Sequence, residues 1–250
     1  MDTVQALHAS WVIPVEPHGT ILEDHTLVIE GDRISAIVPT ESWLNGNSAA
    51  IEIDCRGHAL IPGLVNAHTH AAMSLFRGLA DDLPLMTWLE QHIWPAEGRV
   101  MGREFVRDGT RLAAAEMLSS GTTCFNDMYF FGDEAASAAI EAGIRAVIGM
   151  IVINFPSAWA NNVDDYLRKG QDIPAKFRQH PLIHSSFVPH APYTVDDSTL
   201  QRIATLAEEL DVPVHMHVHE TAAEVSTATT THGARPLSRL AGLGLNTPRL

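Results

Sequence analysis

The sequence predicts an α/β protein that joins a small N-terminal β-sandwich module to a (β/α)8 TIM-type barrel, of which about the first five strands are present. Before residue 60, short strand-like runs are separated by turn residues. Beyond it, near-continuous apolar strands alternate with helical stretches, which is typical of a parallel sheet covered by helices. Candidate functional residues follow several different strands, as in a barrel, whereas an open sheet has its site at one switch point. We therefore divide the chain into residues 1–59 and 60–250.

The N-terminal module is predicted from its strand-like runs, which cover residues 4–15, 20–30, 33–38 and 50–54. Gly31-Asp32 lies between Ile29 and Ile34, and such a pair between apolar residues is typical of a tight hairpin turn. Residues 1–59 are therefore expected to form a small β-module ahead of the barrel.

The barrel portion is predicted from alternating strands and helices. Strands are expected at residues 60–67, 122–126, 146–153, 182–188 and 212–218, and helices at 104–119, 133–141 and 196–210. Gly121 and Gly143 end the first two helices, and Asp196 is a good N-cap for the third. A complete barrel needs eight strands and usually about 250 residues for itself. We therefore expect the chain to be the N-terminal portion of a longer enzyme.

Composition limits the possible partners. The 250 residues, 46% hydrophobic, can bury a large core, and 16 basic against 30 acidic residues give a net charge of −14, which opposes binding to nucleic acid. Two cysteines, Cys55 and Cys124, form no disulfide framework and indicate a reducing compartment. The N-terminus lacks signal-peptide features, and no apolar run approaches the roughly 20 residues that span a bilayer. We expect a cytoplasmic protein with no membrane partner.

A histidine pair ends the first barrel strand. His68 and His70 are two residues apart, so in a strand both side chains point the same way and can reach one cation. Neutral imidazoles that converge in this manner are typical zinc ligands. The alternative is a pair of surface histidines in a loop.

The fifth predicted strand supplies a second histidine cluster. His215, His217 and His219 are expected on one face, with apolar residues on the other. Such a strand is costly unless a metal or a polar substrate occupies the interior, and the alternative is a polar edge strand. Glu220 lies three residues after His217, just beyond the strand, where a carboxylate can act as the general base for a metal-activated water.

Two further residues are candidates for substrate binding. His190 follows a predicted strand and lies between Pro189 and Pro192, on a loop at the same end of the barrel. It is either a hydrogen-bond donor to substrate or a turn histidine. Glu97 follows Trp94-Pro95, and its spacing alone favours a solvent-facing glutamate.

Four motifs resemble a known family. They are Pro-Gly-Leu-Val-Asn-Ala-His-Thr-His at 62–70, Gly-Thr-Thr at 121–123, Pro-His-Ala-Pro-Tyr at 189–193 and His-Val-His-Glu-Thr at 217–221. In this order the sequence resembles the amidohydrolase superfamily, in the branch of 5′-methylthioadenosine/S-adenosylhomocysteine deaminases. That branch also contains chlorohydrolases and guanine deaminases. The resemblance covers essentially the whole chain.

The resemblance implies a single metal ion, usually zinc, held by His68, His70 and His217. It implies that Glu220 shuttles protons, that His190 binds substrate and that Glu97 binds ribose hydroxyls. The family also has a histidine on the next strand and a metal-binding aspartate on the last one, both expected beyond Leu250. Arginines that some members place after the third strand are not evident at residues 153–159, so recognition of the substrate tail stays open.

We therefore expect metal-dependent hydrolytic deamination of an adenosine-type nucleoside to the inosine-type product and ammonia. The metal is expected to be one Zn²⁺ per subunit, although three histidines also suit Fe²⁺ or Ni²⁺. The alternatives are guanine deamination or s-triazine dechlorination at the same site and, in another class, a non-catalytic metal-binding module. The partner is a small-molecule nucleoside, and the sequence leaves a homo-oligomer open.

Overall fold

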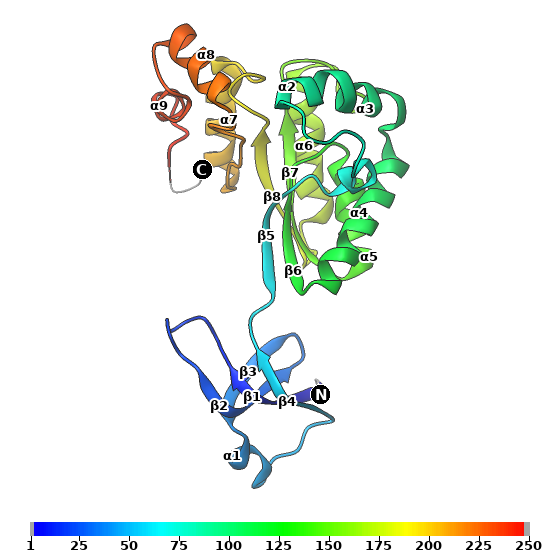
Figure 1. Ribbon diagram of the computed structural model, residues 1–250, viewed down its shortest axis with the longest axis vertical. Helices are drawn as coiled ribbons and strands as arrows, with labels where there is room; N and C mark the ends of the chain where they lie inside the picture. The colour runs from blue at the N-terminus through cyan, green and yellow to red at the C-terminus, as the bar shows by residue number, and fades with distance from the viewer. Residues whose placement is uncertain (1–2, 248–250) are drawn as a thin grey trace. The chain divides into compact units, whose positions relative to one another are not determined.

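A computed structural model describes residues 3–247 of the chain. The chain divides into two compact units, Met1–Gly63 and Leu64–Leu250. Figure 1 shows their strands and helices. None of the helices in the described part is long and apolar enough to cross a membrane.

The first unit is built on one four-stranded sheet in the order β3-β2-β1-β4. Its strands are β1 (Val4–Val12), β2 (Leu22–Glu30), β3 (Arg33–Pro39) and β4 (Ile51–Leu60). One short helix, α1 (Thr40–Leu44), lies between β3 and β4. The predicted hairpin turn is confirmed, since Glu30 pairs with Arg33 and Gly31 has a φ of 61°. The fourth strand-like run was predicted to end at residue 54, whereas β4 continues to Leu60 because its end pairs with the end of β1.

The second unit contains the predicted parallel sheet. Its strands follow chain order, β5 (Leu64–Thr69), β6 (Thr122–Asp127), β7 (Arg145–Val152) and β8 (Ile183–Pro189), and every neighbouring pair is parallel. The first strand of this sheet begins at Leu64 rather than at the predicted residue 60, because Leu60 belongs to β4 and Pro62-Gly63 separates the two strands. As a result His68 lies within β5 and His70 directly follows it.

The fifth predicted strand, residues 212–218, is not a regular strand. It forms a single parallel bridge, Phe187 to Val214, and two of its flanking backbone bonds join Phe187 N to Pro213 O and His215 N to Phe187 O, both at 2.9 Å. A longer ladder is interrupted because Pro189 and Pro213 have no N–H to donate. The segment nevertheless runs beside β8, so its histidines remain at the end of the sheet.

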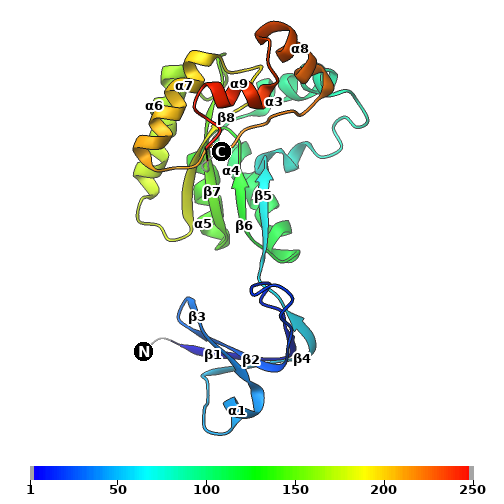
Figure 2. The ribbon, with the colours of Figure 1, turned by 90° about the vertical axis from the view of Figure 1, so that its left-hand side faces the viewer.

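Helices pack along the strands of the second unit, as Figures 1 and 2 show. The predicted helices 104–119, 133–141 and 196–210 are confirmed as α4 (Arg103–Ser119), α5 (Gly132–Ala142) and α7 (Asp197–Leu210). Asp196 caps α7 by accepting a hydrogen bond from the Thr199 N–H at 2.8 Å. The remaining helices are α2 (Leu85–Trp88), α3 (Trp94–Val100), α6 (Val163–Phe177), α8 (Ala222–His232) and α9 (Pro236–Gly242).

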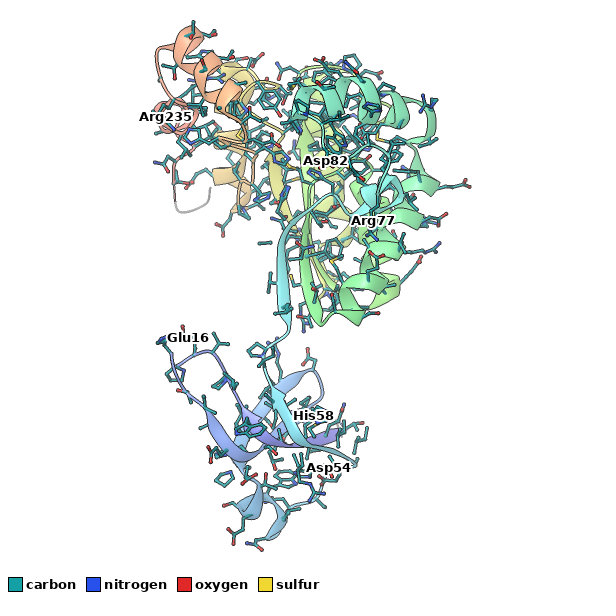
Figure 3. The ribbon with its side chains drawn as sticks, in the orientation of Figure 1. Glu16, Asp54, His58, Arg77, Asp82 and Arg235 are labelled. Carbon is teal, nitrogen blue, oxygen red and sulfur yellow. The ribbon has the colours of Figure 1, made fainter. Side chains whose placement is uncertain are left out.

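A long connection links β5 to α2. It includes a 3-10 turn, Ala71–Phe76, and then the segment on which Figure 3 marks Arg77 and Asp82. The Arg77 guanidinium donates two hydrogen bonds, of 2.9 and 2.6 Å, to the Glu116 carboxylate on α4. This two-point contact fixes the connection against the helix.

Candidate metal centre and active site

Three histidines from two distant parts of the chain meet at the end of the sheet. One ring nitrogen each from His68, His70 and His217 lies within 4.8 Å of the other two. The ring centroids are 4.9 Å apart for His68 and His70, 4.8 Å for His68 and His217, and 5.2 Å for His70 and His217. These are the histidines that the sequence analysis selected as ligands, and the structure brings all three together.

Hydrogen bonds prepare two of these rings for a cation. The Nδ1 atom of His70 lies 2.6 Å from the Met128 carbonyl, which can only accept, so Nδ1 carries the proton and Nε2 is left as a ligand. Nδ1 of His68 lies 2.7 Å from Nε2 of His215. When His68 donates in that pair, its Nε2 is likewise free.

The local environment keeps the cluster neutral. Burial, together with neighbouring imidazoles, lowers the pKa of His70 to about 4 and that of His217 to about 3, and the hydrogen bond to the Met128 carbonyl offsets part of the change at His70. Burial also lowers the pKa of His68. Since a metal binds the unprotonated imidazole, the cluster is in its metal-binding form at neutral pH.

Asp127 supports the histidine cluster from behind. This carboxyl group, 2% exposed at the end of β6, accepts a hydrogen bond of 2.7 Å from the Ala71 N–H, directly after His70. Burial raises its pKa to about 7, and the bonds from the Ala71 and Met128 N–H groups lower it in part. Asp127 therefore ties the chain around His70 to β6.

The prediction that His215, His217 and His219 share one face is wrong for His219. His215 reaches His68, and His217 reaches the cluster, but the Nε2 atom of His219 accepts a hydrogen bond of 3.4 Å from the Leu237 N–H on α9. The backbone of His219 has a φ of 60°, which breaks the alternation of an extended strand. Only two of the three histidines therefore share the site.

A cavity of about 260 Å³ joins the histidines to the other predicted residues. Its wall includes His70, His217, His190, Glu220 and Glu97. The rest of the lining is predominantly apolar and includes Leu85, Trp88, Ile93, Trp94, Met101 and Phe155. A concave apolar pocket with a few convergent polar groups is typical of a site for a small molecule.

His190 lies beside the cluster as a neutral ring. Its centroid is 5.2 Å from that of His217, and its Nδ1 lies 2.9 Å from the Thr194 hydroxyl. Burial lowers the pKa of His190 to about 4. The ring therefore has one nitrogen engaged by protein and a second nitrogen left for a ligand in the cavity.

Glu220 lies in the cavity wall on a turn that two other residues hold. The Tyr193 hydroxyl donates to its Oε2 at 3.1 Å. The buried Glu224 carboxylate accepts from the His219 N–H at 3.1 Å and from the Glu220 N–H at 2.7 Å. Thr221 caps α8 by accepting from the Glu224 N–H at 3.1 Å. Glu224 was not among the predicted site residues, although Thr221 and Glu224 have the Thr-x-x-Glu spacing of a capping box.

Glu97 is buried, so the solvent-facing position favoured by its spacing is wrong. It is 9% exposed on α3, and the Tyr129 hydroxyl donates to its Oε1 at 2.6 Å. Burial raises the pKa of Glu97, and the Tyr129 hydrogen bond lowers it in part. A π-helical turn, Leu89–Ile93, precedes α3 and shifts the phase of the helix, which a regular helical period does not anticipate.

The chain is similar to proteins of known family. A sequence model of the amidohydrolase family matches residues 59–250. The chain belongs to the amidohydrolase family. It is 52% identical over 243 residues to a 5-methylthioadenosine/S-adenosylhomocysteine deaminase of Teredinibacter turnerae, covering 97% of this chain and 55% of that protein. It is 39% identical over 233 residues to a 5′-deoxyadenosine deaminase of Methanothrix thermoacetophila, covering 93% and 54%. The chain thus spans about half the length of these curated relatives.

Solved structures confirm the amidohydrolase fold, whose barrel is of the TIM type. A zinc-bound adenosine deaminase of Xanthomonas campestris superposes with a TM-score of 0.96 at 49% identity, covering 98% of this chain and 56% of that one. An atrazine chlorohydrolase of Arthrobacter aurescens has a TM-score of 0.84 at 20% identity, covering 98% and 59%. A guanine deaminase of C. acetobutylicum has 0.85 at 19%, covering 98% and 61%. At such identities these last two show the fold alone.

Proposed function

We propose that the full-length protein catalyses the hydrolytic deamination of an adenosine-type nucleoside, such as 5′-methylthioadenosine, S-adenosylhomocysteine or adenosine. One observation carries this proposal: a single cavity brings the histidine cluster, Glu220, His190 and a buried Glu97 together. The names of the curated relatives and of the zinc-bound neighbour support it. The reaction consumes water and yields the inosine-type product and ammonia.

We propose that His68, His70 and His217 hold one Zn²⁺ ion per subunit. The donor set fits, because three imidazoles kept neutral by burial match the nitrogen ligands of catalytic zinc sites. A zinc ion held there would supply a water acidic enough to lose a proton near neutral pH. The same donors suit Fe²⁺ or Ni²⁺, so metal analysis of the purified protein is needed to name the ion.

Glu220 and His190 are proposed to serve the reacting ring. Glu220 takes a proton from the attacking water and delivers it to a purine ring nitrogen, while Tyr193 occupies its other carboxylate oxygen. His190 offers its free ring nitrogen to the substrate. Hydroxide adds to the purine carbon that bears the amine. The proton of the new hydroxyl group then passes to the amine, the C–N bond breaks, and ammonia leaves as the carbonyl of the inosine-type product forms.

Glu97 is proposed to bind the vicinal ribose hydroxyls. A carboxylate in a largely apolar wall accepts hydrogen bonds strongly, since little water competes for it. Apolar side chains such as Trp88 and Trp94 give a thioether tail a suitable surface.

We further propose how these units belong to a complete enzyme. The sheet of the first unit would form one layer of a β-sandwich, and β5 to β8 would be the first strands of a (β/α)8 barrel, with the domain boundary near residues 59–64. In this proposal the remaining strands follow Leu250 and bring an aspartate ligand and a further histidine to the site. The acidic composition opposes a nucleic-acid partner, and the presence of only two cysteines supports a reducing compartment such as the cytoplasm.

A substrate panel tests the proposed reaction. The zinc-loaded full-length protein is incubated with 5′-methylthioadenosine, S-adenosylhomocysteine, adenosine, adenine, guanine and atrazine, and ammonia release and ultraviolet absorbance are followed. We expect turnover of the nucleosides in preference to adenine. Activity on guanine alone, or dechlorination of atrazine alone, would replace the proposed reaction with that one. Zinc binding without turnover of any compound would indicate a non-catalytic module.

A further inference from the structure

Tyr129 connects the two chemically different parts of the cavity wall. It lies two residues after the end of β6, is 4% exposed and lines the cavity together with Glu97 and His70. Its ring is in edge contact with the His70 ring, with centroids 6.4 Å apart, and its hydroxyl points to the Glu97 carboxylate.

The contact between Tyr129 and Glu97 is short and buried. The hydroxyl donates to Oε1 at 2.6 Å, as expected of a hydrogen bond to an ionised carboxylate. Within residues 3–247, no other group donates a hydrogen bond to this carboxylate. Oε1 is therefore occupied by protein, while Oε2 has no protein donor and is available to a ligand in the cavity.

We propose that Tyr129 is a positioning residue for ribose selection, acting through Glu97. By holding Oε1, the hydroxyl fixes the carboxylate in one orientation before substrate binds, so that Oε2 accepts from the vicinal hydroxyls. This inference rests on the proposed function, because it names the residue that sets the ribose specificity of the same site. Preorganisation of this kind improves binding by removing the cost of ordering a side chain.

A double-mutant cycle separates this role from simple packing. Tyr129→Phe removes the hydroxyl and keeps the ring, and Glu97→Ala removes its acceptor. We expect Tyr129→Phe to raise KM for adenosine roughly tenfold while kcat stays within about threefold, the size of one hydrogen bond to a charged group. The preference for adenosine over 2′-deoxyadenosine and 3′-deoxyadenosine should shrink by a similar factor. In the Glu97→Ala background, Tyr129→Phe should change neither quantity.

Two further variants serve as controls for the effect of removing the Tyr129 hydroxyl. Tyr166→Phe is the matched control, since this buried tyrosine donates to the Phe155 carbonyl at 3.3 Å and not to Glu97, and it should leave the preference unchanged. Tyr129→Met supplies a second side chain without a hydroxyl and should reproduce the Tyr129→Phe result if that variant folds poorly.

The possible outcomes distinguish a failure of the role proposed for Tyr129 from a failure of the proposed deamination. If the wild-type protein deaminates adenosine but Tyr129→Phe keeps its full preference for ribose, the role of Tyr129 is overturned and the reaction stands. An equal loss on all three nucleosides, or the same loss in the Glu97→Ala background, would also overturn it and indicate packing alone. If the wild-type protein deaminates none of them, the proposed function itself fails.

Discussion

The two ends of the cavity use burial in opposite ways. At the histidine end, burial lowers the pKa of His70 and His217, which keeps the bases neutral. At the other end, burial raises the pKa of Glu97, and the Tyr129 hydroxyl offsets part of that rise. In each case a low-dielectric wall disfavours the charged form. Burial therefore favours metal binding at the histidine end, whereas at the carboxylate end it makes a hydrogen-bond donor necessary to keep Glu97 ionised.

The two ends also differ in how the backbone supports them. His68 and His70 lie at the end of β5, on a parallel sheet whose neighbouring strands fix its position. Glu97 lies on α3, in the connection between β5 and β6, where substitutions and insertions are better tolerated. We infer that the strand end determines the type of reaction and that the connection determines which substrate is accepted. Substitutions at the two ends should therefore have different consequences.

Removal of a histidine ligand should abolish the chemistry. His217→Ala deletes one of three imidazoles, so bound zinc should fall well below one ion per chain and deamination should fall to background. Elemental analysis and an ammonia assay measure both quantities. His232→Ala, an exposed histidine at the end of α8, is the control and should keep its metal. Full zinc content in His217→Ala would refute the ligand assignment.

Glu220→Gln should separate catalysis from metal binding. The amide cannot shuttle a proton, so kcat should fall by roughly 10²- to 10⁴-fold, the usual size of general acid–base catalysis, while zinc content stays at one. Glu209→Gln, an exposed glutamate on α7, provides the matched control. A kcat within tenfold of the wild-type value would remove Glu220 from the mechanism.

Glu224→Gln should have a smaller effect through the turn that carries Glu220. The amide offers one acceptor oxygen in place of two, so one of the backbone N–H groups of His219 and Glu220 loses its partner. We expect a loss of about 1–3 kcal/mol in the free energy of unfolding. Misplacement of Glu220 should lower kcat by roughly tenfold. Denaturant titration and kinetics measure the two effects. An unchanged kcat would show that Glu224 is not needed to position Glu220.

The metal-free protein should lose stability on acidification. The folded-state pKa is about 4 for His70 and His190 and about 3 for His217, against 6.5 for an ordinary histidine. The unfolded state then binds more protons below about pH 6.5, so the free energy of unfolding falls as the pH drops from there toward 4. Asp127, with a raised pKa of about 7, and Glu97, whose pKa is also raised, oppose this change, whereas the lowered pKa values of His68 and His215 add to it. Thermal melts at pH 5 and 6.5 should give the lower midpoint at pH 5, and a higher midpoint there would contradict the burial of these rings.

Sequence periodicity predicted the histidine end better than the carboxylate end. His68 and His70 converge because strand side chains alternate, and this rule depends only on spacing. The same rule failed at His219, where a positive φ breaks the alternation. It could not place Glu97, because a π-helical turn changes the phase of α3.

Tyr129 and Glu224, which hold the two site carboxylates in place, could not be predicted from the sequence pattern. Tyr129 is 32 residues from Glu97 in the chain, and their contact exists only once β6 and α3 have packed. Glu224 is close to Glu220 in sequence, and its capping-box spacing was visible, but its bonds to two backbone N–H groups depend on the unusual conformation of His219. The alternating pattern at residues 212–218 predicted a regular strand, but Pro213 in this segment and Pro189 at the end of β8 have no N–H to complete the ladder.

Ligand binding without turnover gives the most direct test of the division between the two ends. Zinc-loaded Glu220→Gln protein is titrated in a calorimeter with adenosine and with 3′-deoxyadenosine. We predict that adenosine binds with a Kd close to the wild-type KM and that the 3′-deoxy compound binds roughly 10- to 100-fold more weakly, because the Glu97 carboxylate loses a hydrogen-bond donor. Equal Kd values for the two nucleosides would contradict the account, because substrate selection would then not reside in the carboxylate end of the cavity.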